Sequence, residues 1–524
     1  MATQPAITTI ELTPKEAQLK GLLLDTASYV NSSQSAAEPV ILRWAGGWVR
    51  DKLLGIESDD IDTAINTMTG EAFASKIVEL CERPEAVEKH RITSDDIGSL
   101  HKIAKNPDKS KHLETTTLKL FGFDVDFVNL RKETYSEDSR NPQMEFGTAE
   151  EDALRRDATV NALFYNLNTS RVEDFTTGLA DMKSKLIRTP LEPFQTFMDD
   201  PLRVLRLVRF ASRLGFKIDP LAEEVMGNVK VLDALKLKIS RERVGVEIEK
   251  MLKGKDPRRS LQYINDLGLY HTIFTDPTKP DAPLPDLSRW YSAYECLHQL
   301  LRNQARRSIS NVLVQTDETS YYAWTLSALA PWEYVDDPPH IGEGKPPPQL
   351  ITLAARKGIK APNKLCDLVS AAHNNRGEIL ALKTAVVQKT SHINERDRFG
   401  MAIRHWDGKG GYWRLQVLFS LLVEAMQRWE VKTISSKNND DFLSEWQIFL
   451  DHLHGLDVLD APSMKRIIDG TQLAKALGVP PGKWMMGALE VCLAWQLRHP
   501  DATDAAGAVE EVNRRREELG IPSS

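Results

Sequence analysis

The hydrophobic pattern of the chain changes once, near Thr196, and this change sets the fold class. Before it, short β-rich runs alternate with helical stretches; the runs are Ile41–Trp44, Ile61–Ile65, Thr115–Leu120 and Asp124–Leu130. After it, amphipathic helical segments follow one another and strand patterns are hard to find. The sequence therefore predicts an α+β fold, with a small mixed β-sheet head followed by an elongated all-α neck, body and tail.

Composition breaks divide the chain into three predicted domains. Residues 1–190 form the head, 191–259 the helical neck, and 260–524 the helical body and tail. Two proline-rich stretches, 275–287 and 331–349, are predicted loops between helical layers.

Charge and composition limit the classes of partner. The net charge is −7, so any surface for nucleic acid must be a local patch. The four cysteines lie far apart without a CxxC pair, which favours a reducing compartment. There is no apolar run of the ~18 residues that a membrane span requires. We expect no membrane partner, a monomer, and a location in the cytoplasm, with mitochondria and nucleus reached through alternative start sites.

A glycine turn opens the head. Gly46 and Gly47 lie between a strand and a short helix that ends at Gly55, and Arg50 lies one turn into that helix. Such a turn lets backbone N–H groups approach an anion, and the start of the helix adds partial positive charge. Gly-Gly turns are common, so a purely structural turn is the alternative.

Two pairs of aspartates follow on predicted strands. Residues two apart on a strand face the same side, so Asp60 projects with Asp62, and Asp124 with Asp126. Like charges held this close are unfavourable unless a cation lies between them, which indicates a divalent-metal site for phosphoryl or nucleotidyl transfer. The alternative is a solvated acidic strand end.

Five ordered motifs resemble those of one enzyme family. The segment GGWVRDKLLGIESDDID, residues 46–62, resembles the signature of class II tRNA nucleotidyltransferases, the CCA-adding enzymes of the polymerase-β-like nucleotidyltransferase superfamily. The later motifs are EDALRRDATVNAL at 151–163, DFTTG at 174–178 with Arg188, DDPLRVLRLVRF at 199–210 and SRERVGVE at 240–247. The amino-acid sequence in and around these motifs looks most like that of the eukaryotic, fungal enzymes of the family.

The resemblance implies an activity and a set of residues. It implies template-independent addition of CCA to the 3′ end of tRNA from CTP and ATP, with Mg²⁺ as cofactor. Asp60 and Asp62 would hold the metal, and Asp126 matches the third acidic residue better than Asp124 does. The nucleotide-binding residues would be Gly46, Gly47, Arg50, Arg156, Asp157, Asn161, Asp200, Arg203, Arg206 and Arg209.

The spacing of the arginines supports an anion site. Arg203, Arg206, Arg209 and Arg213 lie on one stripe of a predicted helix whose opposite side is apolar. Four guanidinium groups on one stripe repel one another unless anions lie along it, and acids are scarce within one helical turn. A triphosphate and an RNA backbone are the expected anions, and surface salt bridges are the alternative.

Asp200 and Arg203 are one turn apart and together offer an acceptor and a fork of donors. Cytosine and adenine present an exocyclic amine beside a ring-nitrogen acceptor, whereas uracil and guanine present a carbonyl and a ring N–H there. A fixed Asp/Arg pair can therefore accept C and A and reject U and G. Alternatively, Asp200 only caps the helix.

The polar segment 131–147, with Arg131 and Arg140, lacks hydrophobic periodicity and is predicted to be a loop. It matches in position the flexible loop that the family uses to switch from CTP to ATP; a plain surface loop is the alternative.

In the body, DGTQLAKALGVPPGK at 469–483 resembles a C-terminal motif of the family, and Lys483 is a candidate RNA contact. The tryptophans of this region, in helical stretches, are expected in the core.

Three rival functions remain open on the sequence. One is a partial activity that adds CC only or A only, and another is a poly(A) polymerase that shares the head. The third is a catalytically silent RNA-binding module, against which the complete carboxylate pair argues.

Overall fold

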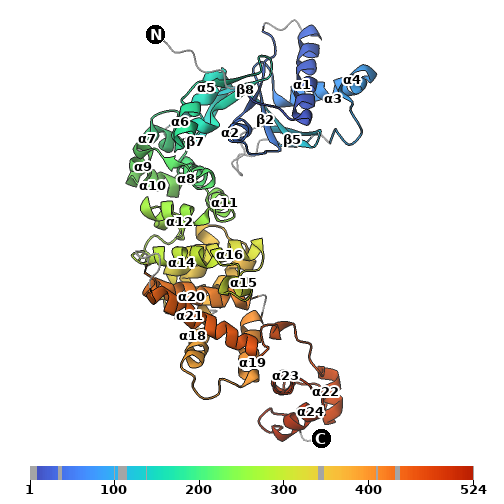
Figure 1. The fold of residues 1–524 in the computed structure, drawn as a ribbon, viewed down its shortest axis with the longest axis vertical. Helices are drawn as coiled ribbons and strands as arrows, with labels where there is room; N and C mark the ends of the chain where they lie inside the picture. Colours follow the sequence, from blue (N-terminus) through green and yellow to red (C-terminus); the bar gives the residue numbers. More distant parts are fainter. Residues whose placement is uncertain are drawn as a thin grey trace. The chain divides into compact units, whose positions relative to one another are not determined.

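The structure is a computed structural model and describes residues 9–33, 38–98, 101–103, 115–136, 139–339, 347–408, 411–430 and 437–522. The chain divides into two compact units, residues 1–247 and 248–524, and each is described by itself (Figure 1). The α+β fold class predicted from the sequence is confirmed: within the described residues every strand lies in the first unit. The three-domain division stays a prediction.

A seven-stranded mixed sheet forms the head, in the order β3-β4-β5-β2-β1-β8-β9. Its strands are β1 (Leu42–Ala45), β2 (Asp60–Ile65), β3 (His101–Ile103), β4 (Thr115–Leu120), β5 (Phe123–Asn129), β8 (Leu163–Asn166) and β9 (Arg171–Asp174). The β2 and β5 strands are parallel neighbours, and the other pairs are antiparallel. All four predicted strands therefore form, each within one residue of its predicted start.

The helices of the first unit follow the chain order. They are α1 (Pro14–Ser33), α2 (Gly47–Leu53), α3 (Gly70–Cys81), α4 (Pro84–His90), α5 (Ala149–Leu154), the single turn η2 (Thr159–Asn161), α6 (Gly178–Ser184), α7 (Pro193–Asp199), α8 (Leu202–Leu214), α9 (Pro220–Met226), α10 (Val229–Lys238) and α11 (Arg241–Leu252), which continues into the second unit. A short parallel pair, β10 (Leu186–Ile187) and β11 (Lys217–Ile218), lies among them.

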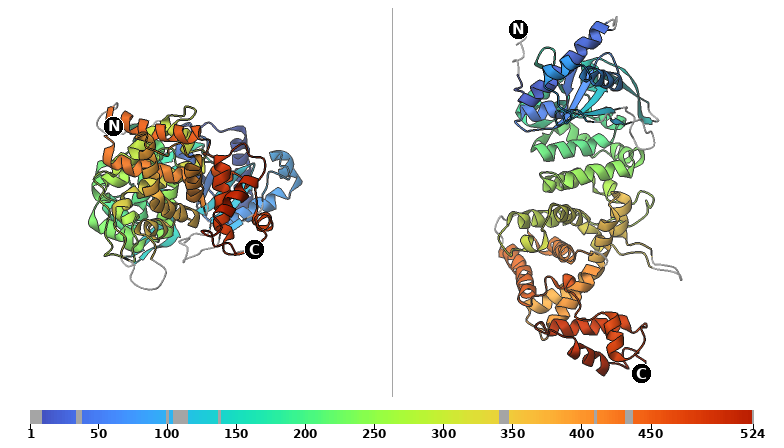
Figure 2. Two further views of the ribbon diagram at one scale, coloured as in Figure 1. Left: turned by 90° about the horizontal axis from the view of Figure 1, so that it is seen from below. Right: turned by 90° about the vertical axis from the view of Figure 1, so that its right-hand side faces the viewer.

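The two faces of the sheet have different roles because side chains alternate along each strand. On β2, Ile61 and Ile65 are buried on the face that α1 and α3 cover (Figure 2). Phe73 of α3 contacts Phe127 of β5 there, with ring centroids 5.8 Å apart. The opposite face of β2 and β5 carries the aspartates, which this packing holds away from the apolar core.

Segment 131–147 differs from its prediction as a loop. It forms an antiparallel hairpin of β6 (Arg131–Ser136) and β7 (Ser139–Phe146). The prediction failed because the hairpin pairs mainly with itself, so its sequence lacks the apolar alternation of a strand that covers a core. The Arg140 side chain lies outside the described residues.

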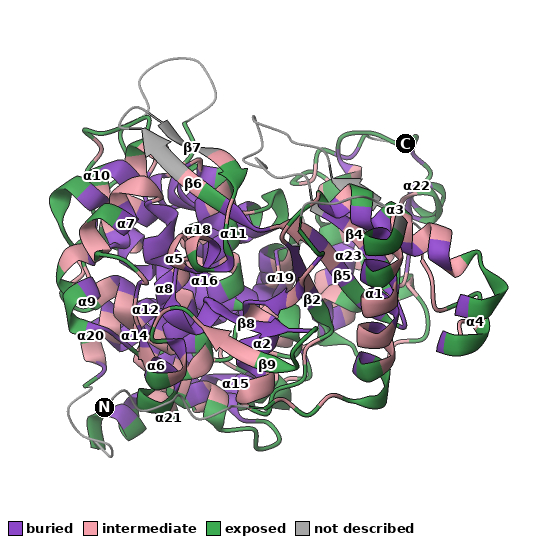
Figure 3. Cartoon of the chain, turned by 90° about the horizontal axis from the view of Figure 1, so that it is seen from above, coloured by how far each residue is buried: buried purple, intermediate pink, exposed green. Residues whose placement is uncertain are grey.

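The helix α8 is amphipathic, as its spacing predicted. Val204, Leu205, Leu207 and Val208 are fully buried on one side, and the arginine stripe lies on the other. Gly215 ends the helix with φ 70°, a left-handed conformation that glycine adopts at little cost. Figure 3 shows α8 and β8 as mostly buried elements of this unit.

The second unit is all-helical within its described residues. Its helices are α12 (Pro257–Asp266), α13 (Tyr270–Ile273), α14 (Trp290–Arg302), α15 (Ile309–Leu313), α16 (Asp317–Leu329), η3 (Ala330–Tyr334), α17 (Leu350–Leu353), the π-helical turn η4 (Ala354–Gly358), α18 (Asn363–Val387), α19 (Arg396–Asp407), α20 (Trp413–Arg428), α21 (Lys437–Gly455), η6 (Ala461–Ser463), α22 (Gly470–Leu477), α23 (Met485–Arg498) and α24 (Ala506–Arg514).

Tryptophans build the core of this unit, as expected. Trp406, Trp413, Trp429, Trp446 and Trp484 are buried, whereas Trp495 is half-buried and stacks on His499. None of the helices in the described part of the chain combines the length and apolar character needed to cross a membrane.

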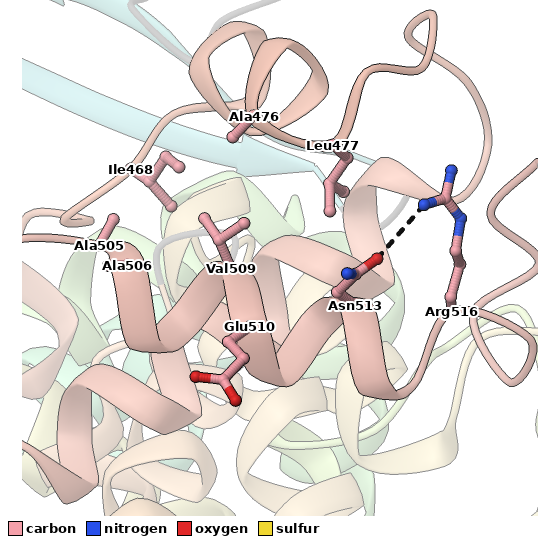
Figure 4. A pocket seen from close by; sticks show the side chains of 9 residues that line it. All are labelled: Ile468, Ala476, Leu477, Ala505, Ala506, Val509, Glu510, Asn513 and Arg516. Atoms are coloured by element: carbon pink, nitrogen blue, oxygen red, sulfur yellow. Dashed lines mark hydrogen bonds between the residues drawn. The ribbon is translucent and has the colours of Figure 1, made fainter. Parts of the chain in front are cut away.

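The three last helices pack around a small core of their own. A pocket of about 590 Å³ opens beside it, with Ile468, Leu477 and Val509 in its apolar wall (Figure 4). At its rim Arg516 donates to the side-chain oxygen of Asn513 over 3.3 Å.

Candidate active site

The aspartates of β2 and β5 lie side by side across the parallel strand pair. The register places Asp60 opposite Asp124 and Asp62 opposite Asp126. Neighbouring strands are about 4.8 Å apart. The two pairs predicted from the sequence are thus brought together on one face. Asp60 and Asp124 are exposed, whereas Asp62 and Asp126 are half-buried.

Crowding and burial perturb the ionisation of the β2 pair. Burial raises the pKa of Asp62 to about 6 against the opposing charge of Arg156, and Asp60 and Asp126 add to the rise. Burial, Asp126 and Asp124 likewise raise the pKa of Asp60 above its ordinary value. A divalent cation between these carboxylates would reverse both effects.

Neighbours on β4 distinguish the two aspartates of β5. The hydroxyl of Thr117 donates to Oδ1 of Asp126 over 2.5 Å. Asp124 instead faces solvent, with Lys119 3.9 Å away. The oriented, half-buried Asp126 is therefore the β5 carboxylate better suited to chemistry.

These donors fit a divalent cation that a bound substrate helps to hold. Within the described residues, no group of three or more His, Cys, Asp and Glu side chains is arranged to hold a metal by itself. Mg²⁺ seldom needs such a set, since one or two carboxylates together with substrate phosphates and water usually bind it. The oxygen donors of Asp60 and Asp62 match that pattern.

The predicted glycine turn lies against this site. Gly46 has φ 67° and ψ −121°, and its N–H donates to the carbonyl of Leu163 over 3.0 Å. A Cβ at Gly46 would lie 2.8 Å from Nη1 of Arg156 and 3.9 Å from Oδ2 of Asp62. The turn thus needs glycine for both conformation and space. Because the N–H of Gly46 is already bonded, Gly47 and the next residues of α2 supply the amides that remain for an anion.

A buried ion cluster holds Arg156 beside Asp62. Nε of Arg156 donates to Asp152 over 3.1 Å, and Arg155 donates to the other oxygen of Asp152 over 2.7 Å. Arg155 also donates to Glu133 over 3.1 Å, and Arg131 donates to the same oxygen of Glu133 over 2.9 Å. Burial, with the nearby charge of Arg155, lowers the pKa of Arg131 to about 10. Arg131 is therefore a fixed part of the hairpin base.

A second network joins the glycine-turn helix to α8. Arg50 donates to the side-chain oxygen of Asn161, whose amide donates to Asp157 over 3.3 Å. Arg206 of α8 donates to the other oxygen of Asp157 over 2.5 Å. Burial acts to raise the pKa of Asp157, but the charge and hydrogen bond of Arg206 hold it at about 2. Four predicted nucleotide-binding residues thus form one chain of contacts.

The other arginines of the stripe also have partners. Arg209 pairs with Glu247 over 2.6 Å, and Arg213 with Asp51 over 3.3 Å. Arg203 donates to the carbonyl of Arg155 over 2.7 Å. The scarcity of acids within one turn did not reveal these partners, because they come from α2, α11 and the RRD segment. Any nucleotide anion must share the guanidinium groups with them.

The predicted base-selecting pair contacts two different groups. Asp200 accepts from Arg243 of α11 over 3.2 Å and from the N–H of Leu202 over 3.2 Å. The second contact is with the first residue of α8, whose N-cap position is Pro201 rather than Asp200. Arg203 turns instead to the backbone of Arg155. Asp200 and Arg203 are therefore each held by a different neighbour, Asp200 by Arg243 and Arg203 by the carbonyl of Arg155.

Lys483 is exposed between α22 and α23, in the second unit. The sequence reasoning missed Asp152 and Thr117. The spacing of Asp152, three and four residues before Arg155 and Arg156, was a helical signal for ion pairing. Thr117 gave no signal, since only strand pairing brings it to Asp126.

Comparison with known proteins agrees with this geometry. Residues 42–188 match the family described as the poly A polymerase head domain, and residues 215–279 match the one described as the probable RNA and SrmB-binding site of polymerase A. The mitochondrial CCA tRNA nucleotidyltransferase of Saccharomyces cerevisiae is 37% identical, over 94% of this chain and 92% of its own. The chain belongs to the CCA tRNA nucleotidyltransferases.

Two further matches extend this result. "Nucleotidyltransferase lcsQ" of Purpureocillium lilacinum is 53% identical over 98% of this chain and 93% of its own. A solved CCA-adding enzyme in complex with ATP shares the fold, with TM-score 0.64 and 20% identity over 98% of this chain and 97% of that one. The predicted family, a eukaryotic class II CCA-adding enzyme, is confirmed, and with it the assignment as a nucleotidyltransferase.

Proposed function

We propose that this CCA tRNA nucleotidyltransferase adds cytidine, cytidine and adenosine to the 3′ end of tRNA from CTP and ATP, without a template. The observation that carries the proposal is the Asp60–Asp62 pair beside Gly46 and Arg156, with both carboxylate pKa values raised. Such a pair suits nucleotidyl transfer. Solved relatives of this fold in complexes with tRNA, with CTP and with ATP support the same substrates.

Asp60 and Asp62 would hold Mg²⁺, which when bound supplies charge neutralisation for the triphosphate and activation of the primer hydroxyl. The new bond joins the 3′-oxygen of the tRNA to the α-phosphorus, and the bond from that phosphorus to the bridging oxygen breaks, which releases pyrophosphate. Asp126, oriented by Thr117, would accept the hydroxyl proton or serve as an additional ligand.

Arg156 and the first amides of α2 would hold phosphates, because they lie beside Asp62. Four further residues would act through the hydrogen bonds that join them, namely Arg50, Asn161, Asp157 and Arg206. The network fixes the distance between the glycine turn and α8, across which the nucleotide would lie. Arg209 would share its guanidinium group between Glu247 and a phosphate.

Asp200 and Arg203 would choose the base, as their donor and acceptor pattern predicts. Their contacts to Arg243 and to the Arg155 carbonyl limit how far each can move. The adjoining hairpin, with Arg131 at its base and Arg140 in β7, is the proposed element for the change from CTP to ATP.

Lys483 would contact the tRNA backbone from the second unit, and we expect the enzyme to act as a monomer. Two relatives carry "mitochondrial" in their names, which supports a mitochondrial pool of this enzyme. Pools in cytoplasm and nucleus remain predictions.

One assay separates the proposed function from its rivals. The purified protein is incubated with tRNA lacking its last three nucleotides, with CTP alone, ATP alone or both. Full activity gives two added cytidines with CTP alone, nothing with ATP alone, and a product that stops at CCA with both.

A stop at CC with both nucleotides, or addition only to tRNA that already ends in CC, would identify a partial enzyme. The other rival is a poly(A) polymerase, and the match of residues 42–188 to the poly A polymerase head domain is the reason to test for it. Unlimited extension with ATP alone would identify that activity instead.

A further inference from the structure

Most arginines of the second unit are bound to other groups. Arg396 pairs with Asp457 over 3.0 Å, Arg428 with Glu445 over 2.7 Å, and Arg515 with Glu518 over 2.6 Å. Arg289 donates to backbone carbonyls at the end of α20. Most guanidinium groups of this unit are therefore used in contacts within the protein.

Arg302, Arg306 and Arg307 differ from this pattern. All three side chains are exposed, and within the described part of the chain none has an ion pair or a side-chain hydrogen bond. They lie within six residues, RNQARR, which contain no acid and no large apolar side chain. We call this segment, residues 302–307, the arginine loop. These three exposed cations are therefore available to bind an anion.

The backbone of the arginine loop is nevertheless firmly held. The hydroxyl of Ser308 donates to the carbonyl of Asn303 over 2.9 Å, and the Arg307 N–H donates to Asn311 over 3.2 Å. Gln447 of α21 donates to the carbonyl of Arg307 over 2.9 Å. These bonds hold Arg307 at φ 67°, a left-handed conformation unusual for a residue with a side chain. The loop is thus a fixed platform that presents three arginines.

We infer that the arginine loop is a docking surface for the phosphate backbone of RNA. This inference rests on the proposed function, which supplies tRNA as the polyanion. A chain of net charge −7 must bind it through local cationic patches. The planar guanidinium fork binds two phosphate oxygens at once, so arginine suits such a surface better than lysine. The absence of large apolar side chains from residues 302–307 argues against a membrane surface.

The test is the salt dependence of tRNA binding by the full-length protein. The probe is a tRNA transcript lacking its last three nucleotides. The triple variant Arg302→Gln, Arg306→Gln, Arg307→Gln should bind it at least about tenfold more weakly at 0.1 M salt. The slope of log affinity against log salt should fall by about 0.9 for each phosphate that the variant no longer neutralises. Because the side chains are exposed and unpaired, the melting temperature should not change.

Three further variants separate the effect of these unpaired charges from the effect of charge in general. Arg306→Gln removes an unpaired charge, whereas Arg515→Gln removes one that Glu518 already neutralises. Only the first should reduce the salt slope. The triple lysine variant, which keeps the charge, should retain most of the slope. Unchanged affinity and slope in the triple glutamine variant would overturn the inference and leave an acidic protein as the partner of the loop.

Failure of the docking surface can be distinguished from failure of the proposed CCA-adding activity. If the wild-type protein extends tRNA but the triple variant has an unchanged KM for tRNA, the docking surface is wrong and the activity stands. If the wild-type protein binds tRNA through this loop yet adds no nucleotide, the docking surface stands and the activity is wrong.

Discussion

Two glycines of the head have almost the same φ but different surroundings. Gly46 (φ 67°) faces Arg156 and Asp62, whereas Gly55 (φ 70°) has open space where a Cβ would be. Gly55→Ala should cost about 1 kcal/mol of stability through backbone strain and leave activity unchanged. Gly46→Ala should add a displacement of Arg156 and raise the KM for CTP and ATP at least about tenfold. Steady-state kinetics and thermal unfolding of both variants check this, and equal KM values would remove Gly46 from the nucleotide site.

Asp62 makes the metal-free protein less stable as pH rises. Its pKa in the folded chain is about 6, above the ordinary value of 3.8, so the folded state holds the proton more tightly. Stability is therefore lost as pH increases from about 4 through 6, and the full loss remains above 6.

Asp62→Asn should consequently stabilise the metal-free protein at pH 8 by on the order of 2 kcal/mol and have no effect near pH 4. Chemical denaturation at both pH values, in the presence of a chelator, measures this. A variant less stable than wild type at pH 8 would mean that neighbours already compensate the Asp62 charge.

At the scale of elements, the contact between Asp157 and Arg206 connects the head to α8. Asp157→Asn should destabilise the protein by about 2 kcal/mol at pH 7, because it leaves Arg206 without its charge partner. In the wild-type protein the pKa of Asp157 is depressed to about 2. The contribution of the ionised Asp157 to the free energy of unfolding is therefore lost only as pH falls below about 4 towards 2.

Glu173→Gln is the matched control, because it breaks a half-buried pair with Arg43 on the strands of the same unit. Both variants should unfold more readily, but only Asp157→Asn should also raise the KM for nucleotides. A similar KM in the two variants would limit Asp157 to a structural role.

The elements also explain what the sequence could and could not predict. Strands such as β2 and β5 were predictable because aspartates alternate with buried residues along 60–63 and 123–127, which is the period of two of a strand. The hairpin of β6 and β7 was not, since its strands pair with each other outside the main sheet and their sequence lacks apolar alternation. The four-arginine stripe was predictable from helical spacing, but its partners Asp51, Asp157 and Glu247 were not, because tertiary contacts bring them in.

At the scale of the whole molecule, the sequence predicted an α+β chain of the CCA-adding family, and the matches at 37% and 53% identity over nearly all of it confirm the family. The order of five motifs carried that prediction. The arginine loop was not predictable in the same way. Its residues look like any polar connection in the sequence, and only the structure shows that they have no ion pair with a described residue, in a unit where most arginines are bonded.

The sharpest experiment on the proposed active site is single-turnover addition of CMP by Asp60→Ala, with tRNA affinity measured on the same preparation. If Asp60 and Asp62 together hold the divalent cation required for the chemical step, incorporation should fall at least about a thousandfold. The tRNA affinity and melting temperature should stay near those of wild type. Incorporation at the wild-type rate would contradict the metal role of the β2 carboxylates and, with it, the proposed active site.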